Sequence, residues 1–106
     1  MNVERPLIRR LIWDAWNLEH IGKHLVQVEE IELLVRRSDW IYKDTYKNRY
    51  LVIGQLSQAR VLTIVVGLTP RSRDEYYVFS ARPSSAKEKR WLREEEGGIA
   101  DDEIVN

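Results

Sequence analysis

The chain has 106 residues, of which 43% are hydrophobic, and a formal net charge of zero. This length suits one domain with one core, and the lack of cysteine excludes disulfides, thiolate catalysis and cysteine-based zinc sites. Because no apolar run approaches the roughly 20 residues of a membrane span, and the N-terminus lacks the apolar segment of a secretion signal, we expect a cytoplasmic protein.

The first third of the sequence predicts a short strand followed by two helices. The apolar run at residues 11–13 predicts the strand, and Asp14 is suited to cap the next helix because its carboxylate accepts free N–H groups of the first turn. That helix should end near His24 and bury the residues that recur at helical spacing, Leu18, Ile21 and Leu25. A second helix at residues 28–37 has an acidic first turn and an apolar stripe of Val28, Ile31, Leu34 and Val35.

The middle of the chain has the periodicity of strands. Residues 40–47 fit either a strand or a loop, and three clearer strands follow at residues 49–55, 60–66 and 76–82. The connections between these three strands suit hairpins. We therefore expect an α+β fold, with a small antiparallel meander of three to four strands, two N-terminal helices and one C-terminal helix.

The C-terminal part predicts a third helix. Ser85 and Glu88 match the S-x-x-E capping box, in which each side chain binds the backbone N–H of the other residue. The helix should dock on the sheet through two apolar residues, Trp91 and Leu92. Gly97-Gly98 should end it.

The charges divide unevenly between a single domain at residues 1–93 and an acidic tail at residues 94–106, which we expect to be flexible. The tail has six acidic residues and no Lys or Arg, so residues 1–93 carry 17 basic and 11 acidic side chains. Such a basic body suits a polyanionic partner. The alternative explanation of this uneven charge distribution is that the tail only keeps the protein soluble and the body binds no polyanion.

Short motifs follow one another in order between about residues 11 and 93. Trp13-Asp14 ends the first strand, and the first helix and its end contain Asn17, Lys23-His24 and Val26. Further along the chain lie Glu29-Glu30, Arg49 to Gly54, Arg60 in R-x-L-x-x-V-V, Ser80-Ala81-Arg82, and Glu88 with Arg90. In this order and spacing, the motifs resemble those of the BrnT-like toxins of bacterial type II toxin–antitoxin systems.

The resemblance implies a RelE/ParE-like fold and a hydrolase, an endoribonuclease toxin whose substrate is RNA. It also implies a BrnA-like antitoxin partner with a DNA-binding domain, in a hetero-oligomer, while a homodimer is the other assembly considered. No membrane partner is expected. The sequence departs from the family at Leu25, where glycine is usual, and at His20, where many members have Asn. The lost glycine, together with the acidic tail and the content of exposed aromatic residues, leaves a second hypothesis open, a non-catalytic RNA- or protein-binding module that keeps the fold.

Metal-independent RNA cleavage by the 2′-hydroxyl requires a base, an acid and cations that stabilise the phosphorane. His24 and Lys23 are the first candidates for catalysis, although His24 can equally close its helix, where a cation favours the C-terminal dipole. His20 and His24 share a helix face, but the sequence offers no obvious third ligand. We therefore predict no metal and no cofactor.

The arginines of the strands are the candidate phosphate ligands. A simple meander places Arg60 near Arg82 across the sheet and Arg49 about six residues away, roughly 20 Å at strand rise. Two arginines that face each other repel, unless an anion lies between them. We therefore predict that Arg60 and Arg82 form a catalytic, phosphate-binding pair and that Arg49 contacts RNA. The alternative for all three is a solvated strand end or an ion pair with a nearby carboxylate.

Other residues suit contacts with RNA outside the catalytic centre. Tyr50 can stack on a base, as can Tyr76 and Tyr77, although alternating strand tyrosines are more often half core. Lys89 and Arg90 lie on a helix face that either approaches RNA or is simply solvated. We expect Glu88 to serve its capping box rather than catalysis, and the tryptophans to be core or partner contacts, Trp13, Trp16, Trp40 and Trp91.

Overall fold

The computed structural model describes residues 5–37, 39–70 and 72–105, with only the backbone described for residues 96–105. In this part of the chain the elements are, in order, β1 (Arg10–Ile12), α1 (Ala15–Gly22), α2 (Val28–Arg37), β2 (Ile41–Thr45), β3 (Arg49–Ser57), β4 (Arg60–Leu68), β5 (Glu75–Pro83) and α3 (Ala86–Val105). The α+β class and the order of helices and strands are confirmed. Among these residues, no helix has both the length and the apolar character of a membrane span.

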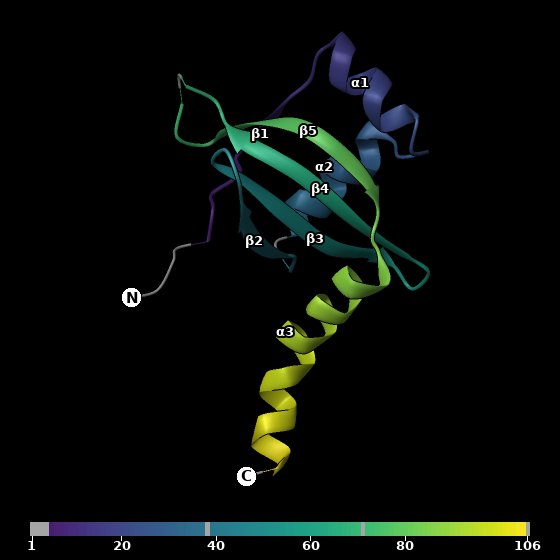
Figure 1. Cartoon of the computed structure of the whole chain (residues 1–106), viewed down its shortest axis with the longest axis vertical. Helices are drawn as coiled ribbons and strands as arrows, with labels where there is room; N and C mark the ends of the chain where they lie inside the picture. The colour runs from purple at the N-terminus through teal and green to yellow at the C-terminus, as the bar shows by residue number, and fades with distance from the viewer. Residues whose placement is uncertain (1–4, 38, 71, 106) are drawn as a thin grey trace.

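The described strands form one five-stranded sheet in the order β1-β5-β4-β3-β2 (Figure 1). Strands β2 to β5 are antiparallel neighbours, as the meander predicted. The expectation of a purely antiparallel sheet was wrong, because β1 pairs with β5 in parallel. The connection from β1 through α1 and α2 carries the chain from one edge of the sheet to the other, so β1 adds to the far edge in the same direction as β5.

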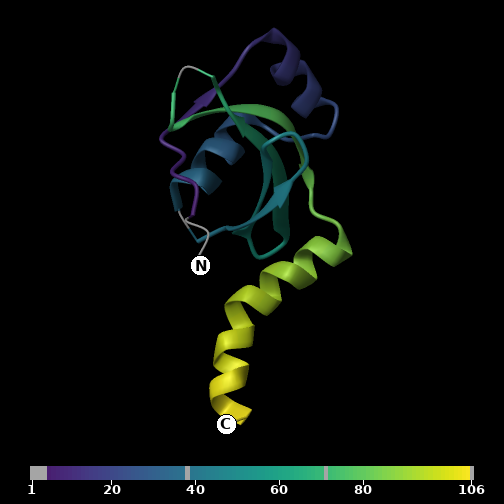
Figure 2. The same cartoon turned by 60° about the vertical axis from the view of Figure 1, so that its left-hand side comes forward.

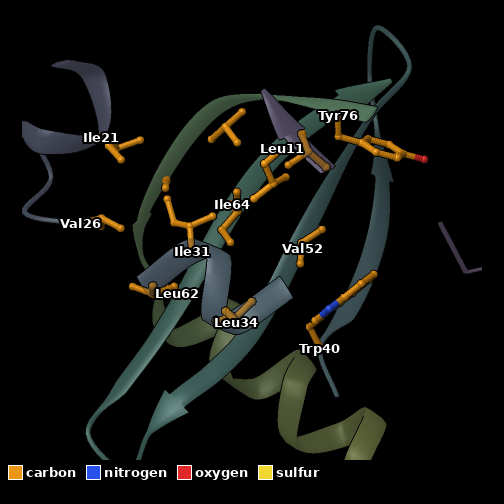
Figure 3. Close-up of a cluster of buried hydrophobic side chains, with 13 residues drawn as sticks. Leu11, Ile21, Val26, Ile31, Leu34, Trp40, Val52, Leu62, Ile64 and Tyr76 are labelled. Atoms are coloured by element: carbon orange, nitrogen blue, oxygen red, sulfur yellow. The ribbon is translucent and has the colours of Figure 1, made fainter. Parts of the chain in front are cut away.

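Helix α2 covers one face of the sheet and forms the main core with it (Figure 3). Ile31 and Leu34 on α2 are fully buried, as their place in the predicted stripe requires. They pack against the even-numbered side chains of β4, which strand alternation turns to this face, Leu62, Ile64 and Val66. Gly54 permits the close approach of α2, since a Cβ there would lie 3.0 Å from Leu34 Cδ2.

Helix α3 docks on the opposite face, and only at one end of the sheet. Its Leu92 and Trp91 pack with Ile41, Ile53 and Val61 in a second, smaller cluster. The helix then continues to Val105 and extends away from the sheet (Figures 1 and 2). The prediction that Gly97-Gly98 ends this helix was wrong, because glycine costs only about 1 kcal/mol relative to alanine within a helix.

Helix α1 is attached to the sheet by a polar residue rather than by a broad apolar stripe. Asp14 caps the helix as predicted, and the buried Asn17 completes a capping box with it. The Asn17 Nδ2 donates to the carbonyls of Ile12 (2.9 Å) and Val78 (3.0 Å), which joins α1 to β1 and β5. The predicted burial of Leu18 and Leu25 was wrong, because α1 touches the edge of the sheet chiefly through Asn17 and Ile21.

Leu25 lies between α1 and α2 in a left-handed backbone conformation, with a φ of 61°. This conformation costs a non-glycine residue about 1–2 kcal/mol and favours glycine. It accounts for the glycine that the resembling family usually has at this position. The Leu25 side chain is 83% exposed, so it contributes little packing against the strain.

Replacing Leu25 by glycine is therefore expected to stabilise the protein by about 1 kcal/mol, because the strain is relieved and little burial is lost. The measurement is urea unfolding followed by circular dichroism. Leu25→Ala is the control, since it removes the side chain but keeps the Cβ that causes the strain. Equal stabilities of the Gly and Ala variants would contradict the explanation.

Candidate functional site

The part of the α3 face that α3 leaves uncovered contains a pocket of about 610 Å³. We call it the aromatic pocket, because rings form much of its wall. Strands β2 to β5 and the start of α1 supply its lining, which consists of Trp16, Thr45, Tyr46, Arg49, Leu51, Val65, Tyr77, Phe79 and Ser80.

Arg49 is the cationic residue in this lining. Its guanidinium lies over the ring of Phe79, with the Cζ atom 3.6 Å from the ring centroid. Gly67, the strand neighbour of Arg49 in β4, makes this contact possible. A Cβ at Gly67 would lie 2.8 Å from Phe79 Cε2 and 3.4 Å from Arg49 Cγ, so a side chain there would push the two groups apart.

Phe79 reaches this face because β5 is irregular at that point. Val66 pairs with Val78, whereas Val65 pairs with Ser80, so Phe79 is an extra residue on the β5 side. Its ring packs against that of Tyr77, with the centroids 4.9 Å apart. The irregularity thus places two neighbouring rings beside one guanidinium.

Tyr77 links the pocket to the first turn of α1. Its hydroxyl donates to the carboxylate of Asp14, at 2.9 Å from Oδ1 and 3.0 Å from Oδ2. Burial and then this hydrogen bond raise the pKa of Tyr77 above its ordinary value. Asp14 therefore holds both the Tyr77 side chain and the helix that carries Trp16.

Trp16 stands at the edge of the aromatic pocket and is 56% exposed. Its ring stacks on that of His20 with centroids 4.8 Å apart and an interplanar angle of 10°. The His20 ring in turn meets the edge of the His24 ring at 5.6 Å. A row of rings therefore leads from the pocket along α1 to the predicted catalytic His24.

The predicted pairing of Arg60 with Arg82 was wrong. Arg82 pairs with Thr63, three positions along β4 from Arg60. Because an odd offset along a strand reverses the face, the two arginines lie on opposite sides of the sheet. The register next to the turn would pair Arg82 with Leu62, on the face of Arg60, but the extra residue at Phe79 shifts the pairing to Thr63 and so moves Arg82 to the opposite face.

Arg60 is bound to α2 and to the connection before it. Its Nε and Nη2 donate to the Glu30 carboxylate at 2.7 and 2.9 Å, and its Nη2 also donates to the Leu25 carbonyl at 2.8 Å. The hydrogen bond from Arg60, opposed by burial, lowers the pKa of Glu30. In the free protein, Arg60 therefore holds the α1–α2 connection, which includes Lys23 and His24.

Arg82 is bound to α3. Its Nη1 and Nη2 donate to the Glu88 carboxylate at 2.6 and 2.7 Å. Glu88 also accepts from the Thr63 hydroxyl and the Ser85 backbone N–H, both at 2.8 Å, while its own N–H donates to Ser85 Oγ at 3.2 Å. The capping box is confirmed. The alternative foreseen for the arginines, an ion pair with a nearby carboxylate, describes both Arg60 and Arg82.

The remaining predicted site residues do not gather at one place. Lys23 and His24 are exposed at the end of α1, and Lys89 and Arg90 are exposed on α3. Tyr50 lies on the other face of the sheet, where its ring contacts the rings of Tyr42 and Tyr76. Of the predicted site residues, Arg49 alone belongs to the described lining of the aromatic pocket.

Apart from Ser80, which belongs to the Ser80-Ala81-Arg82 motif, the sequence assigned no site role to the other residues of this pocket. Trp16 was expected to be a core or partner contact, and only Tyr77 had been considered as a stacking residue. Tyr46 and Phe79 carry no motif. The signal that could have found Phe79 is Gly67, which leaves room for it, but the pairing of these two strands is not readable from the sequence.

The fold and the pocket define a small α+β protein whose mixed sheet offers a cation and several rings to a ligand. A solved structure with this fold is that of the Brucella abortus ribonuclease toxin BrnT. The match has a TM-score of 0.56 and 19% sequence identity, and it covers 72% of this chain and 96% of that chain. The resemblance seen in the sequence motifs is thus confirmed at the level of the fold. No protein-family model matches this sequence, and a search of the curated proteins found no match.

Proposed function

We propose that this protein is the toxin of a type II toxin–antitoxin system and an endoribonuclease that binds RNA in the aromatic pocket. The observation that carries the proposal is the Arg49 guanidinium held over Phe79 beside Tyr77 and Trp16. A guanidinium binds phosphate well, and bases stack on exposed rings. The pocket therefore has a binding group for the phosphate and for the base of a nucleotide. The shared fold with a ribonuclease toxin supports the same function.

The proposed reaction is metal-independent attack of the 2′-hydroxyl on the adjacent phosphate. A base removes the 2′-hydroxyl proton, the bond from phosphorus to the 5′-oxygen breaks, and an acid protonates that oxygen as it leaves, so that the products are a 2′,3′-cyclic phosphate and a 5′-hydroxyl. Arg49 stabilises the charge that develops on the phosphorane. An RNA strand that leaves the pocket along the ring row of α1 meets His20 and then His24 with Lys23. Imidazole is the side chain that serves most often as general acid and base, so we assign proton transfer to this helix.

The biological setting follows from the same proposal. The toxin acts in the cytoplasm, adopts a RelE/ParE-like fold and is neutralised by a BrnA-like antitoxin with a DNA-binding domain. Residues 94–106 form an acidic tail outside the RNA-binding domain. The assembly is a toxin–antitoxin hetero-oligomer, with a homodimer as the other candidate.

A specific observation favours a second candidate, a non-catalytic RNA- or protein-binding module. The two arginines that the sequence motifs assigned to catalysis are both engaged by carboxylates, Arg60 by Glu30 and Arg82 by Glu88. Neither guanidinium is available to a phosphate while these ion pairs last. This candidate predicts salt-sensitive RNA binding without cleavage.

The test is RNA cleavage by the purified protein with EDTA present, together with growth of cells that express it. Wild type is expected to cleave RNA and arrest growth, whereas Trp16→Ala loses most of both because a stacking ring at the pocket edge is removed. Leu18→Ala is the matched control, an exposed α1 residue outside the pocket lining, and should behave as wild type.

Absence of cleavage and of growth arrest by a folded wild-type protein would overturn the toxin proposal. RNA binding without cleavage would favour the module. Equal activities of the Trp16 and Leu18 variants would place the site elsewhere on the molecule.

A further inference from the structure

A second pocket lies on the other side of Arg49, at the end of the sheet. Its volume is about 800 Å³. We call it the polar pocket, because many of its lining side chains are polar or charged, among them Asp44, Asn48, Thr69, Ser72 and Arg73. Thr45 and Arg49 belong to both pockets, so the two cavities are adjacent and have one arginine in common.

Residues 72–74, which supply part of the polar pocket, are held by hydrogen bonds. Ser72 Oγ donates to Asp74 Oδ1 at 2.8 Å, and Arg9 Nε donates to Asp74 Oδ2 at 2.8 Å. The backbone N–H groups of Arg9 and Arg10 also donate to the Asp74 carbonyl, at 2.9 and 3.2 Å. The hydrogen bonds of Ser72 and Asp74 therefore fix the backbone on both sides of Arg73.

Thr69 gives an independent indication of a ligand. Its Oγ1 is buried and has no hydrogen-bond partner among the described residues, although Thr69 lines the polar pocket. A buried hydroxyl without a partner costs free energy, so such groups are normally satisfied. Because Oγ1 has no accessible surface in the free protein, a ligand oxygen in the pocket would become its partner once the Thr69 side chain turns toward the pocket.

We propose that the two pockets are neighbouring subsites for single-stranded RNA. The aromatic pocket takes a base, and the polar pocket takes the sugar and phosphate of the adjacent nucleotide, with Arg49 between them. Arg73 binds that phosphate, and the Thr69 hydroxyl hydrogen-bonds to one of its oxygens. This inference rests on the proposed RNA binding and deepens it, because it defines the substrate as an oligonucleotide rather than a mononucleotide.

The charged residues that line the polar pocket predict opposite effects of two substitutions on RNA binding. Arg49 and Arg73 attract a phosphate, while the exposed carboxylate of Asp44 on the same lining repels it. Removing the Arg73 charge should therefore weaken binding, and removing the Asp44 charge should strengthen it. A pocket of structural or protein-binding origin would not respond to both changes in this way.

The experiment is fluorescence titration of the full chain with a labelled 2′-O-methyl tetranucleotide, which cannot be cleaved, and with a nucleoside monophosphate. Arg73→Gln is expected to weaken tetranucleotide binding about tenfold and to lower the salt slope by about one, with the monophosphate unaffected. Asp44→Asn should bind the tetranucleotide more tightly, and Thr69→Val more weakly. Arg36→Gln is the control, because it removes the same charge from α2, outside both pockets.

The outcomes separate this inference from the proposed function. If wild type binds the tetranucleotide and Arg73→Gln behaves as Arg36→Gln does, the second subsite is wrong while RNA binding stands. Equal effects of Arg73→Gln on the tetranucleotide and the monophosphate would also overturn it. If wild type binds neither probe, the proposed function fails and this inference with it.

Discussion

Replacing Arg49 by alanine is expected to lower kcat/KM for RNA cleavage by about two orders of magnitude or more. This is the usual cost of removing a preorganised group that stabilises charge in a transition state. Arg49→Lys should recover little of the activity, because lysine keeps the charge but loses the planar fork that stacks on Phe79 and binds two phosphate oxygens.

The measurement is the cleavage rate of an end-labelled RNA, with thermal unfolding of each variant alongside. Lys47→Ala is the control, since Lys47 is an exposed cation in the neighbouring turn and lies outside both pocket linings. Full activity of a folded Arg49→Ala protein would show that the catalytic centre lies outside the aromatic pocket. The exposed Lys23 and His24 would then be the next residues to test.

Replacing Glu88 by glutamine is expected to lower the free energy of unfolding by about 2 kcal/mol. Hydrogen bonds to a charged group contribute about 1.5–3 kcal/mol, and Glu88 receives several. Its side chain is 8% exposed, whereas that of Arg82 is 38% exposed and can turn to water once the pair is lost. The cost should therefore stay in the lower part of that range. Urea unfolding at pH 7 measures it.

The contribution of Glu88 should depend on pH with a definite sign. The hydrogen bonds from Arg82 are the largest cause that lowers the pKa of Glu88 from 4.5 to about 2 in the folded protein. A carboxyl with a lowered folded pKa stabilises the fold above its unfolded pKa and loses this effect as pH falls toward the folded value. The difference between wild type and Glu88→Gln should therefore shrink between pH 5 and pH 2.

The control for this pH dependence is the loss of a carboxylate that is exposed on the same helix and makes none of the hydrogen bonds of Glu88. Glu94→Gln provides it, and its stability should match that of wild type at each pH. A difference between wild type and Glu88→Gln that does not change with pH would contradict the electrostatic explanation. It would show that the substitution acts through packing of α3 on the sheet.

Local signals in the sequence were sufficient for the elements of this fold. The apolar stripe of α2 predicted both its bounds and its buried residues, because a helix repeats its buried face every 3.6 residues. Asp14 and the Ser85–Glu88 box marked the starts of α1 and α3, since capping needs only residues that are near in sequence. The motifs around Arg49 and Lys23-His24 also predicted the BrnT-like fold.

The sequence by itself thus determined the order and approximate positions of the elements, apart from residues 40–47 and the end of α3, and the presence of cations on the strands. Only the tertiary structure decided which of those cations share a site. A change of one residue in strand register moves a side chain to the opposite face, and no local signal gives the register between β4 and β5. That register separated Arg60 from Arg82, and its irregularity at Phe79 placed this ring over Gly67 and against Arg49 in the aromatic pocket.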